Sequence, residues 1–159
     1  MIAGYAQNGQ AEEAMELFKK MWLVGMKPNS KTYASVLPGC ADLEHGMEIH
    51  GEIIRSGFQS HVLVESALVD MYARCGSVED ARHLFAKMRK WDTMSWAVMI
   101  AGVMRNGWDE EARKLFREMQ LAAVKPNSKT FQCILLACAN LGALEQGMEV
   151  HEEINRRGF

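Results

Sequence analysis

One long segment occurs twice in this chain. Residues 1–33 align without a gap on residues 99–131, and the two copies begin MIAGYAQNGQAEEAM and MIAGVMRNGWDEEAR. The match continues through CADLEHGMEIH at 40–50 and CANLGALEQGMEVH at 138–151, where the earlier copy is three residues shorter. Because insertions and deletions collect in surface connections, we expect a loop at this point. A repeat of this length predicts an array of similar units that bury a continuous core between neighbours.

A shorter period within each copy predicts helices. Apolar residues with the spacing of one helical face recur three times, as Ala14, Leu17, Phe18, Met21; Ala81, Leu84, Phe85, Met88; and Ala112, Leu115, Phe116, Met119. The units between them keep this spacing with Gly46, Ile49, His50, Ile53 and with Gly147, Val150, His151, Ile154. Another apolar stretch precedes each of these helices, and a glycine-containing break separates the two. We therefore predict an all-α chain of helix-turn-helix hairpins.

Local signals mark where helices and units end. Ser77, followed by Glu79 and Asp80, has the pattern of a capping box, in which the serine oxygen accepts a hydrogen bond from a backbone N–H. The tripeptide Lys-Pro-Asn closes units at 27–29 and 125–127, because proline disfavours a helix at the residue before it. Such hairpins cannot bury their apolar faces alone. We expect them to stack into an α-solenoid, a right-handed superhelix whose concave groove is lined by the first helices.

Three strings carry a family resemblance. YAQNGQAEEAMELFKKM, LVDMYARCGSVEDARHLFAKM and CANLGALEQGMEVHEEI resemble plant pentatricopeptide repeat proteins of the class whose units alternate between a standard, a longer and a shorter type. The resemblance extends over the whole chain and divides it into units 1–29 (standard), 30–61 (long), 62–92 (short), 93–127 (standard) and 128–159 (long). By that comparison the first unit lacks its start and the last lacks its end. We therefore expect a fragment of a larger protein, able to self-associate through its uncapped terminal hairpins.

The resemblance implies sequence-specific binding of single-stranded RNA in chloroplasts or mitochondria, one base per repeat, in RNA processing or C-to-U editing. In this family two side chains per unit read the base, one early on the first helix and one at the end of the unit, and an apolar residue near the start of the unit sandwiches it. Carried over by position, the short unit supplies Ser66 and Asp92 as readers, with Leu63 and Met94 as the sandwiching residues. An ionised aspartate only accepts hydrogen bonds, so Asp92 favours guanine or uracil, and guanine is the prediction. The alternative is that Asp92 only caps the helix starting near Thr93.

The other units supply less complete reading pairs. Their candidates are Ala97 with Asn127, Ala34 with His61, Gln132 without a partner, and Asn29, whose partner would precede the chain. Alanine cannot form the hydrogen bond expected of a reader. In the two long units Lys31 and Lys129 replace the sandwiching apolar residue. The short unit therefore supplies the only complete pair that fits the code of the family it resembles.

Catalysis is not predicted. His50-Gly51-Glu52 and His151-Glu152-Glu153 match the H-x-E half of the zinc-deaminase signature, but no P-C-x-x-C follows either of them. Both histidines occupy the helical position that holds phenylalanine in the other units, so we expect packed histidines. The cysteines show no metal-ligand spacing, which favours buried, reduced thiols at Cys40, Cys75, Cys133 and Cys138. We expect no enzyme activity, no metal and no cofactor.

A second function class stays open because of the charge of the chain. Lys and Arg usually supply much of the affinity of a protein for nucleic-acid phosphates, but here the formal net charge is -2. This class is an α-solenoid scaffold that binds protein, such as organellar RNA-editing factors, or peptides as tetratricopeptide arrays do. The unit-final Asn29, Asp92 and Asn127 favour RNA instead. No apolar run has the length of a membrane-spanning helix, and the first residues lack a secretion signal, so we expect no membrane partner. Location in a chloroplast or mitochondrion rests on the resemblance alone.

Overall fold

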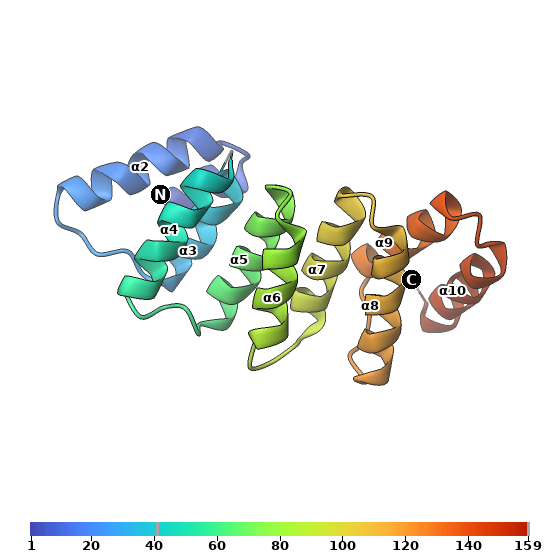
Figure 1. Cartoon of the computed structure of the whole chain (residues 1–159). Coiled ribbons are helices and arrows are strands. Elements are labelled where there is room, and N and C mark those ends of the chain that lie inside the picture. Colours follow the sequence, from blue (N-terminus) through green and yellow to red (C-terminus); the bar gives the residue numbers. More distant parts are fainter. Residues whose placement is uncertain (41, 159) are drawn as a thin grey trace. The chain divides into compact units, whose positions relative to one another are not determined.

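The structure, a computed structural model, describes residues 1–40 and 42–158. In that part of the chain every regular element is a helix (Figure 1). The elements are α1 (Ile2–Gln7), α2 (Ala11–Leu23), α3 (Ser30–Val36), the 3-10 helix η1 (Leu37–Gly39), α4 (Leu43–Arg55), α5 (Val62–Arg74), α6 (Val78–Lys87), α7 (Thr93–Arg105), α8 (Asp109–Leu121), α9 (Ser128–Asn140) and α10 (Leu144–Arg157). The predicted all-α class is confirmed.

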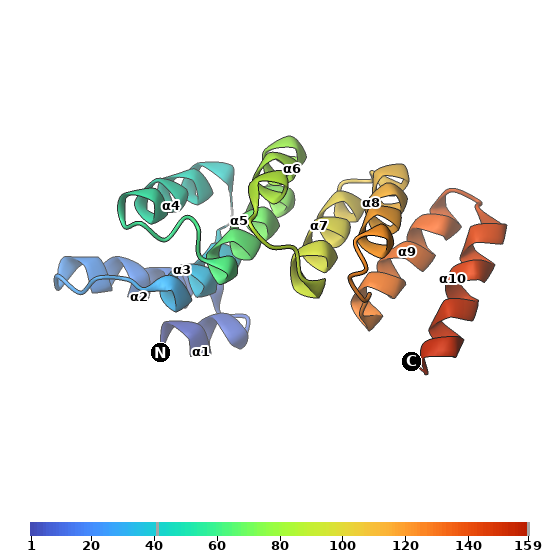
Figure 2. The ribbon, with the colours of Figure 1, turned by 90° about the horizontal axis from the view of Figure 1, so that it is seen from below.

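The chain forms two compact units, Met1–Arg89 and Lys90–Phe159. In the first unit α3 packs against α1 and α5, while α2 packs against α1 and α3, and α4 and α6 pack against α5 (Figure 2). In the second unit α9 packs against α7, α8 and α10, and α7 also packs against α8. Each unit is therefore a stack in which alternate helices form one layer and the helices between them form the other, as the hairpin pattern predicts.

Helices α3 and α9 each bury one large aromatic side chain in the first turn. Tyr33 on α3 and Phe131 on α9 are buried and pack edge-on against phenylalanines of the preceding helix, with ring centroids 5.9 Å apart for Tyr33–Phe18 and 6.0 Å for Phe131–Phe116. Edge-to-face pairs of this kind stabilise a fold by roughly 0.5–1.5 kcal/mol beyond the burial of their area. The two long copies thus repeat the same packing unit. The predicted helical faces are confirmed by the burial of Ala14, Phe18, Ala81, Phe85, Met88, Ala112, Leu115, Phe116 and Met119.

The two copies differ where their lengths differ. Helix α9 continues to Asn140, whereas α3 ends at Val36 and is followed by η1, which contains Pro38 at the position of Leu136. Proline cannot donate the helical hydrogen bond, so the helix ends before it. The later copy then turns through 141–143, residues that the earlier copy lacks. The length difference therefore falls in the connection, as predicted.

The predicted capping box at Ser77 is wrong. Ser77 does precede α6, but its hydroxyl donates to the carboxylate of Asp80 and makes no bond to a backbone N–H. Its ψ of 66° departs from the extended backbone, with ψ of 168–177°, that the capping residues of α3, α4, α7 and α9 adopt. The extended conformation places the side-chain oxygen over the first turn, and Ser77 lacks it.

At two glycines in equivalent positions of the two copies, we expect substitution by alanine to have opposite effects on stability. A methyl group at Gly46 on α4 would overlap Sδ and Cε of the buried Met71, whereas one at Gly147 on α10 would lie 3.6 Å from Cys138 Cβ, an ordinary contact. Alanine adds about 1 kcal/mol of helix propensity at either site. Overpacking costs about 1–3 kcal/mol at Gly46 alone. In urea unfolding we expect Gly147→Ala to raise the free energy of unfolding and Gly46→Ala to lower it. Equal shifts in the two variants would contradict the tight α4–α5 packing.

Candidate nucleic-acid interface

The residues that close three of the expected units are helix caps. Asn29, Asp92 and Asn127 precede α3, α7 and α9, and each Oδ1 accepts a hydrogen bond from a backbone N–H three residues later, at 2.9, 2.8 and 2.9 Å. Asp92 therefore does cap the helix that starts at Thr93, as the alternative interpretation requires. A cap occupies one side-chain oxygen only. The second polar atom, Oδ2 of the aspartate or Nδ2 of the asparagines, takes no part in it.

The residue three positions after each cap supplies a hydroxyl group. Thr32 and Thr130 each direct Oγ1 to the capping asparagine Oδ1, at 3.1 and 2.9 Å. Ser95 behaves differently: its Oγ accepts from Asp92 N at 2.9 Å and donates to Asp92 O at 3.0 Å, completing a capping box with the backbone. Helices α3, α7 and α9 therefore begin with one of two hydrogen-bond patterns, asparagine with threonine at α3 and α9 and aspartate with serine at α7.

His61, the last residue of the expected unit 30–61, is the exception. It precedes α5 without a side-chain capping bond, and the residue three positions on is the buried Val64, which has no hydroxyl. His61 is exposed, as are Asn29 and Asp92, while Asn127 is half-buried. Four reading candidates therefore reach solvent at helix starts, but only three of them are fixed by a cap.

The candidates on the first helices differ in access. Gln132 is exposed, Ser66 and Ala34 are half-buried, and Ala97 is only 2% exposed. A buried methyl group offers neither a donor nor an acceptor to a base. The expected sandwiching residues are accessible, with Leu63 52% and Met94 60% exposed. Ser66 and Leu63 belong to the first compact unit, and Asp92 and Met94 to the second.

Within the second unit two unit-final residues lie on one edge. Helices α7 and α9 pack side by side, and Thr93 Oγ1 donates to the carbonyl of Lys125 at 2.9 Å, which joins the start of α7 to the segment before α9. Asp92 and Asn127 are therefore presented at neighbouring helix starts. Exposed lysines surround the two asparagine caps: Lys27, Lys31, Lys125 and Lys129. This local positive charge is not visible in the net charge of the chain.

In the first unit, Asn29, Lys31 and Thr32 border a hollow of about 560 Å³ whose other walls come from α1, α2, α3 and the α2–α3 connection. Much of that wall is apolar, including Ile2, Leu17, Met21, Val24 and Met26. A polar reader beside apolar surface is the arrangement in which a base stacks with one face while its edge is hydrogen-bonded.

Sequence reasoning missed Glu65, which precedes the candidate reader Ser66. On α5 it occupies the first-turn position that holds Tyr33 on α3 and Phe131 on α9. Its Oε2 is buried with no hydrogen-bond partner in the described part of the chain, and this burial raises the pKa of the carboxyl, partly offset by the positive charges of Arg89 and His61. The sequence did contain a signal for Glu65, because an acidic residue stands there at a position that is aromatic in the other helices.

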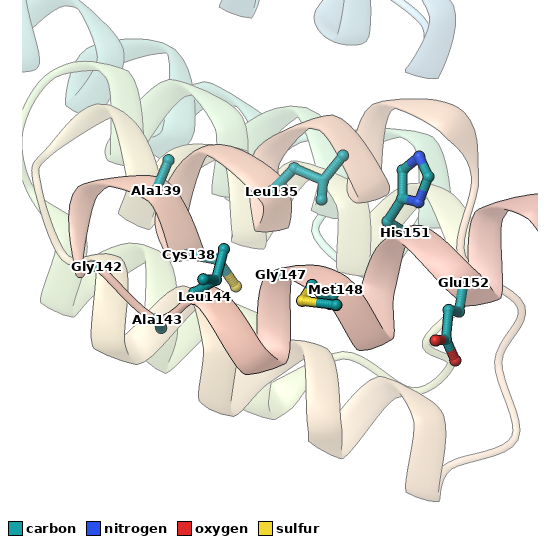
Figure 3. A pocket seen from close by; sticks show the side chains of 10 residues that line it. All are labelled: Leu135, Cys138, Ala139, Gly142, Ala143, Leu144, Gly147, Met148, His151 and Glu152. Carbon is teal, nitrogen blue, oxygen red and sulfur yellow. The ribbon is translucent and has the colours of Figure 1, made fainter.

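The histidines of the deaminase-like pattern differ in their surroundings. His50 Nδ1 lies 2.9 Å from the Tyr72 hydroxyl, the two rings meet edge-on at 5.6 Å, and burial lowers the pKa of His50. The expectation of a packed histidine is thus confirmed at His50. It is wrong at His151, which is exposed and borders an apolar hollow of about 470 Å³ on the α9–α10 hairpin (Figure 3). Glu153 pairs with Arg157 and accepts from Gln120. Among the described residues no three His, Cys, Asp or Glu side chains are grouped to hold a metal.

All four cysteines are free thiols, as expected, but only Cys40 and Cys138 are buried, and Cys75 and Cys133 are half-buried. Burial raises the pKa of all four, that of Cys40 to about 11. The thiols are therefore protonated, and poor nucleophiles, at neutral pH.

Repeated hairpins with capped first helices define a helical repeat protein. Sequence comparison identifies the repeat family. The profile described as the PPR repeat family matches residues 1–42 and 91–140, and a PPR repeat profile matches 66–92. The chain belongs to the pentatricopeptide repeat family.

Its relatives are plant proteins. It is 40% identical to pentatricopeptide repeat-containing protein At2g33680 of Arabidopsis thaliana over 162 aligned positions, which cover 100% of this chain and 22% of the relative. It is 42% identical to the mitochondrial At3g02330 (94% and 17% covered) and 44% identical to the chloroplastic At1g11290 (96% and 19% covered), both from the same plant. The chain thus spans about a fifth of the length of these relatives.

Solved structures share the fold. The pentatricopeptide repeat protein PPR10, known from maize and solved in complex with an 18-nt psaJ RNA element, matches with a TM-score of 0.83 at 21% identity, over 99% of this chain and 24% of PPR10. The PPR domain of protein-only RNase P 1 from Arabidopsis thaliana, in complex with tRNA, matches with a TM-score of 0.74 at 13% identity, over 99% of this chain and 87% of that domain. These likenesses establish the solenoid fold. Among the described residues, no helix is both long and apolar enough to span a membrane.

Proposed function

We propose that this chain binds single-stranded RNA and reads bases with the residues that close its units. The observation that carries the proposal is the set of three Asn and Asp side chains at the starts of α3, α7 and α9. One oxygen of each accepts the capping hydrogen bond, and Asn29 and Asp92 are exposed while Asn127 is half-buried. Exposed lysines beside two of them supply phosphate-neutralising charge where the strand would pass. The family membership and the RNA-bound PPR10 and RNase P structures support the same ligand class.

We propose Ser66 and Asp92 as the readers of one base, with Leu63 and Met94 against its faces. The free acceptor of Asp92 matches the ring N–H that guanine presents on its Watson–Crick edge. Asn127 and Asn29 present an amide N–H₂ instead, which matches a ring acceptor of adenine or cytosine. Gln132, Ala34, His61 and Ala97 complete the proposed set as secondary positions.

Asp92→Asn tests this proposal. Asn29 and Asn127 show that asparagine caps these helices, so the cap is expected to survive while the free atom changes from acceptor to donor. We expect the base opposite the 62–92 unit to change from guanine to adenine, a shift of about 1–3 kcal/mol. The measurement is equilibrium binding of two RNAs that differ at that base, with the chain flanked by further repeats to raise the affinity. Equal binding of both RNAs before and after the substitution would contradict the reading role.

The cellular process that this RNA binding would serve is proposed from the relatives. Chloroplastic and mitochondrial proteins among them support a place in organellar RNA processing, and we propose C-to-U editing as the process served, with the chain supplying recognition and other proteins the chemistry.

One observation favours protein binding as a second function. In the first unit a groove of about 560 Å³ runs between α2 and α4 and is lined by Met15, Phe18, Trp22 and Met47. The equivalent groove between α8 and α10 holds about 290 Å³, has Arg113 in place of Met15, and is crossed by the Gln120–Glu153 hydrogen bond. A protein held in the first groove would lose affinity in Trp22→Gln, which copies the second groove, while RNA binding would not change.

A further inference from the structure

The two hydrogen-bond patterns at the helix starts have a chemical reason. An asparagine side chain ends in two different atoms, and a rotation of its amide would exchange a donor for an acceptor at the exposed position. An aspartate ends in two equivalent oxygens, so the same rotation changes nothing. A unit that ends in asparagine therefore needs its amide fixed in one orientation if it is to present a defined group, and a unit that ends in aspartate does not.

The structure supplies this fixation only where it is needed. At Asn127 the Thr130 backbone N–H, which can only donate, and the Thr130 hydroxyl both bond to Oδ1 at 2.9 Å. Because that oxygen only accepts, Oγ1 must be the donor, and the amide N–H₂ is left as the free group. The same double donation recurs from Thr32 to Asn29. Beside Asp92, the Ser95 hydroxyl instead pairs with the backbone of Asp92 and leaves the carboxylate to a single backbone donor.

We infer that Thr130 is a positioning residue for base selection: its hydroxyl holds the Asn127 amide so that N–H₂ faces the nucleotide. This inference rests on the proposed reading function and assigns its specificity at this unit to a buried residue that does not touch RNA. Thr130 is completely buried, so its hydroxyl reaches solvent or ligand only through Asn127. The hydroxyl acts through the orientation of its neighbour.

Thr130→Val removes the hydroxyl and nearly conserves shape. The substitution is compatible with the fold, because α5 carries the buried Val64 at the equivalent position. The backbone N–H of residue 130 still caps through one bond, and the amide loses its second donor. One net hydrogen bond corresponds to about 0.5–1.5 kcal/mol, so we expect the preference for adenine over guanine at the facing base to fall about threefold to tenfold. Thr130→Ser, which restores the hydroxyl, is expected to restore the preference.

The experiment enriches a pool of short random single-stranded RNAs on the full chain and on its T130V, T130S and Asn127→Asp variants. The expected result is a base preference that N127D moves toward guanine, T130V weakens and T130S retains, with little change in total RNA bound. A preference that moves in N127D and is unchanged in T130V overturns the inference and leaves the reading function intact. A pool that shows no preference in the unsubstituted chain, and none in N127D, overturns the proposed function and the inference with it. Without RNA, the Asn127 side-chain N–H₂ signals in NMR are expected to broaden or shift in T130V only, and identical amide dynamics in T130V and T130S also overturn it.

Discussion

Phe131→Ala is expected to lower the free energy of unfolding of the second unit by about 3–5 kcal/mol, the usual effect of removing a fully buried ring. Phe131 is 2% exposed and packs edge-on against Phe116, and the Arg157 guanidinium lies over its ring, 5.9 Å from the centroid. Alanine would remove both contacts and leave a cavity between α8, α9 and α10. Urea unfolding followed by circular dichroism measures the loss.

Phe131→Tyr is the matched control, since the earlier copy has Tyr33 at this position. There the tyrosine hydroxyl lies 2.9 Å from Ser56 Oγ, and Ser56 corresponds to Arg157 in the later copy. The two copies thus pair tyrosine with a hydroxyl and phenylalanine with a cation above its ring. Tyrosine at 131 keeps the ring and lacks only the hydroxyl partner, so its cost is expected to be well below that of alanine. Equal destabilisation by the two substitutions would show that the ring contacts do not determine stability here.

Leu136→Pro is expected to destabilise the second unit by about 3 kcal/mol or more, because proline removes a hydrogen bond inside α9 and clashes with the preceding turn. Leu136 is 57% exposed, so little packing is lost with its side chain. Helix α3 accommodates Pro38 at this position only by ending at Val36, in a copy with a different connection. Far-UV circular dichroism is expected to show a loss of helix together with the lower stability.

Leu136→Ala separates the backbone effect from the side-chain effect, and we expect it to shift stability by less than about 0.5 kcal/mol at this surface position. The Asn127–Thr130 cap should persist in Leu136→Pro, because α3 retains the Asn29–Thr32 cap despite Pro38. If the alanine and proline variants unfold alike, backbone hydrogen bonding at residue 136 does not control α9.

The buried faces of the helices were predictable because the spacing of apolar residues along the sequence indicates them. The faces containing Phe18, Phe85 and Phe116 are buried as their 3.6-residue period indicates. The early end of α3 was not predicted, although Pro38 is visible in the sequence, because the alignment of the two copies located only the length difference in their connections. The cap at Ser77 failed since the motif does not specify the backbone angle on which a cap depends.

The candidate site was predictable in part. Asn29, Asp92 and Asn127 were identified because they match the unit-final position of the family. The sequence also has a serine or threonine three residues after each of them, and the structure shows its hydroxyl group hydrogen-bonded to the capping residue. The burial of Ala97 and the exposure of His151 depend on which neighbouring helices cover them, and a periodic pattern in one helix does not contain that information.

The caps also bear on how such repeats can be exchanged by protein engineers. A side chain that ends one sequence unit is held by the first turn of the next helix, as Asn127 is held by Thr130. A cassette cut between residues 127 and 128 would separate Asn127, the proposed base-selecting residue, from Thr130, whose two donors hold its amide. A grafted unit would then carry the asparagine without the hydrogen bonds that fix its orientation. Cassette junctions placed after the third residue of the first helix would keep each asparagine with its threonine.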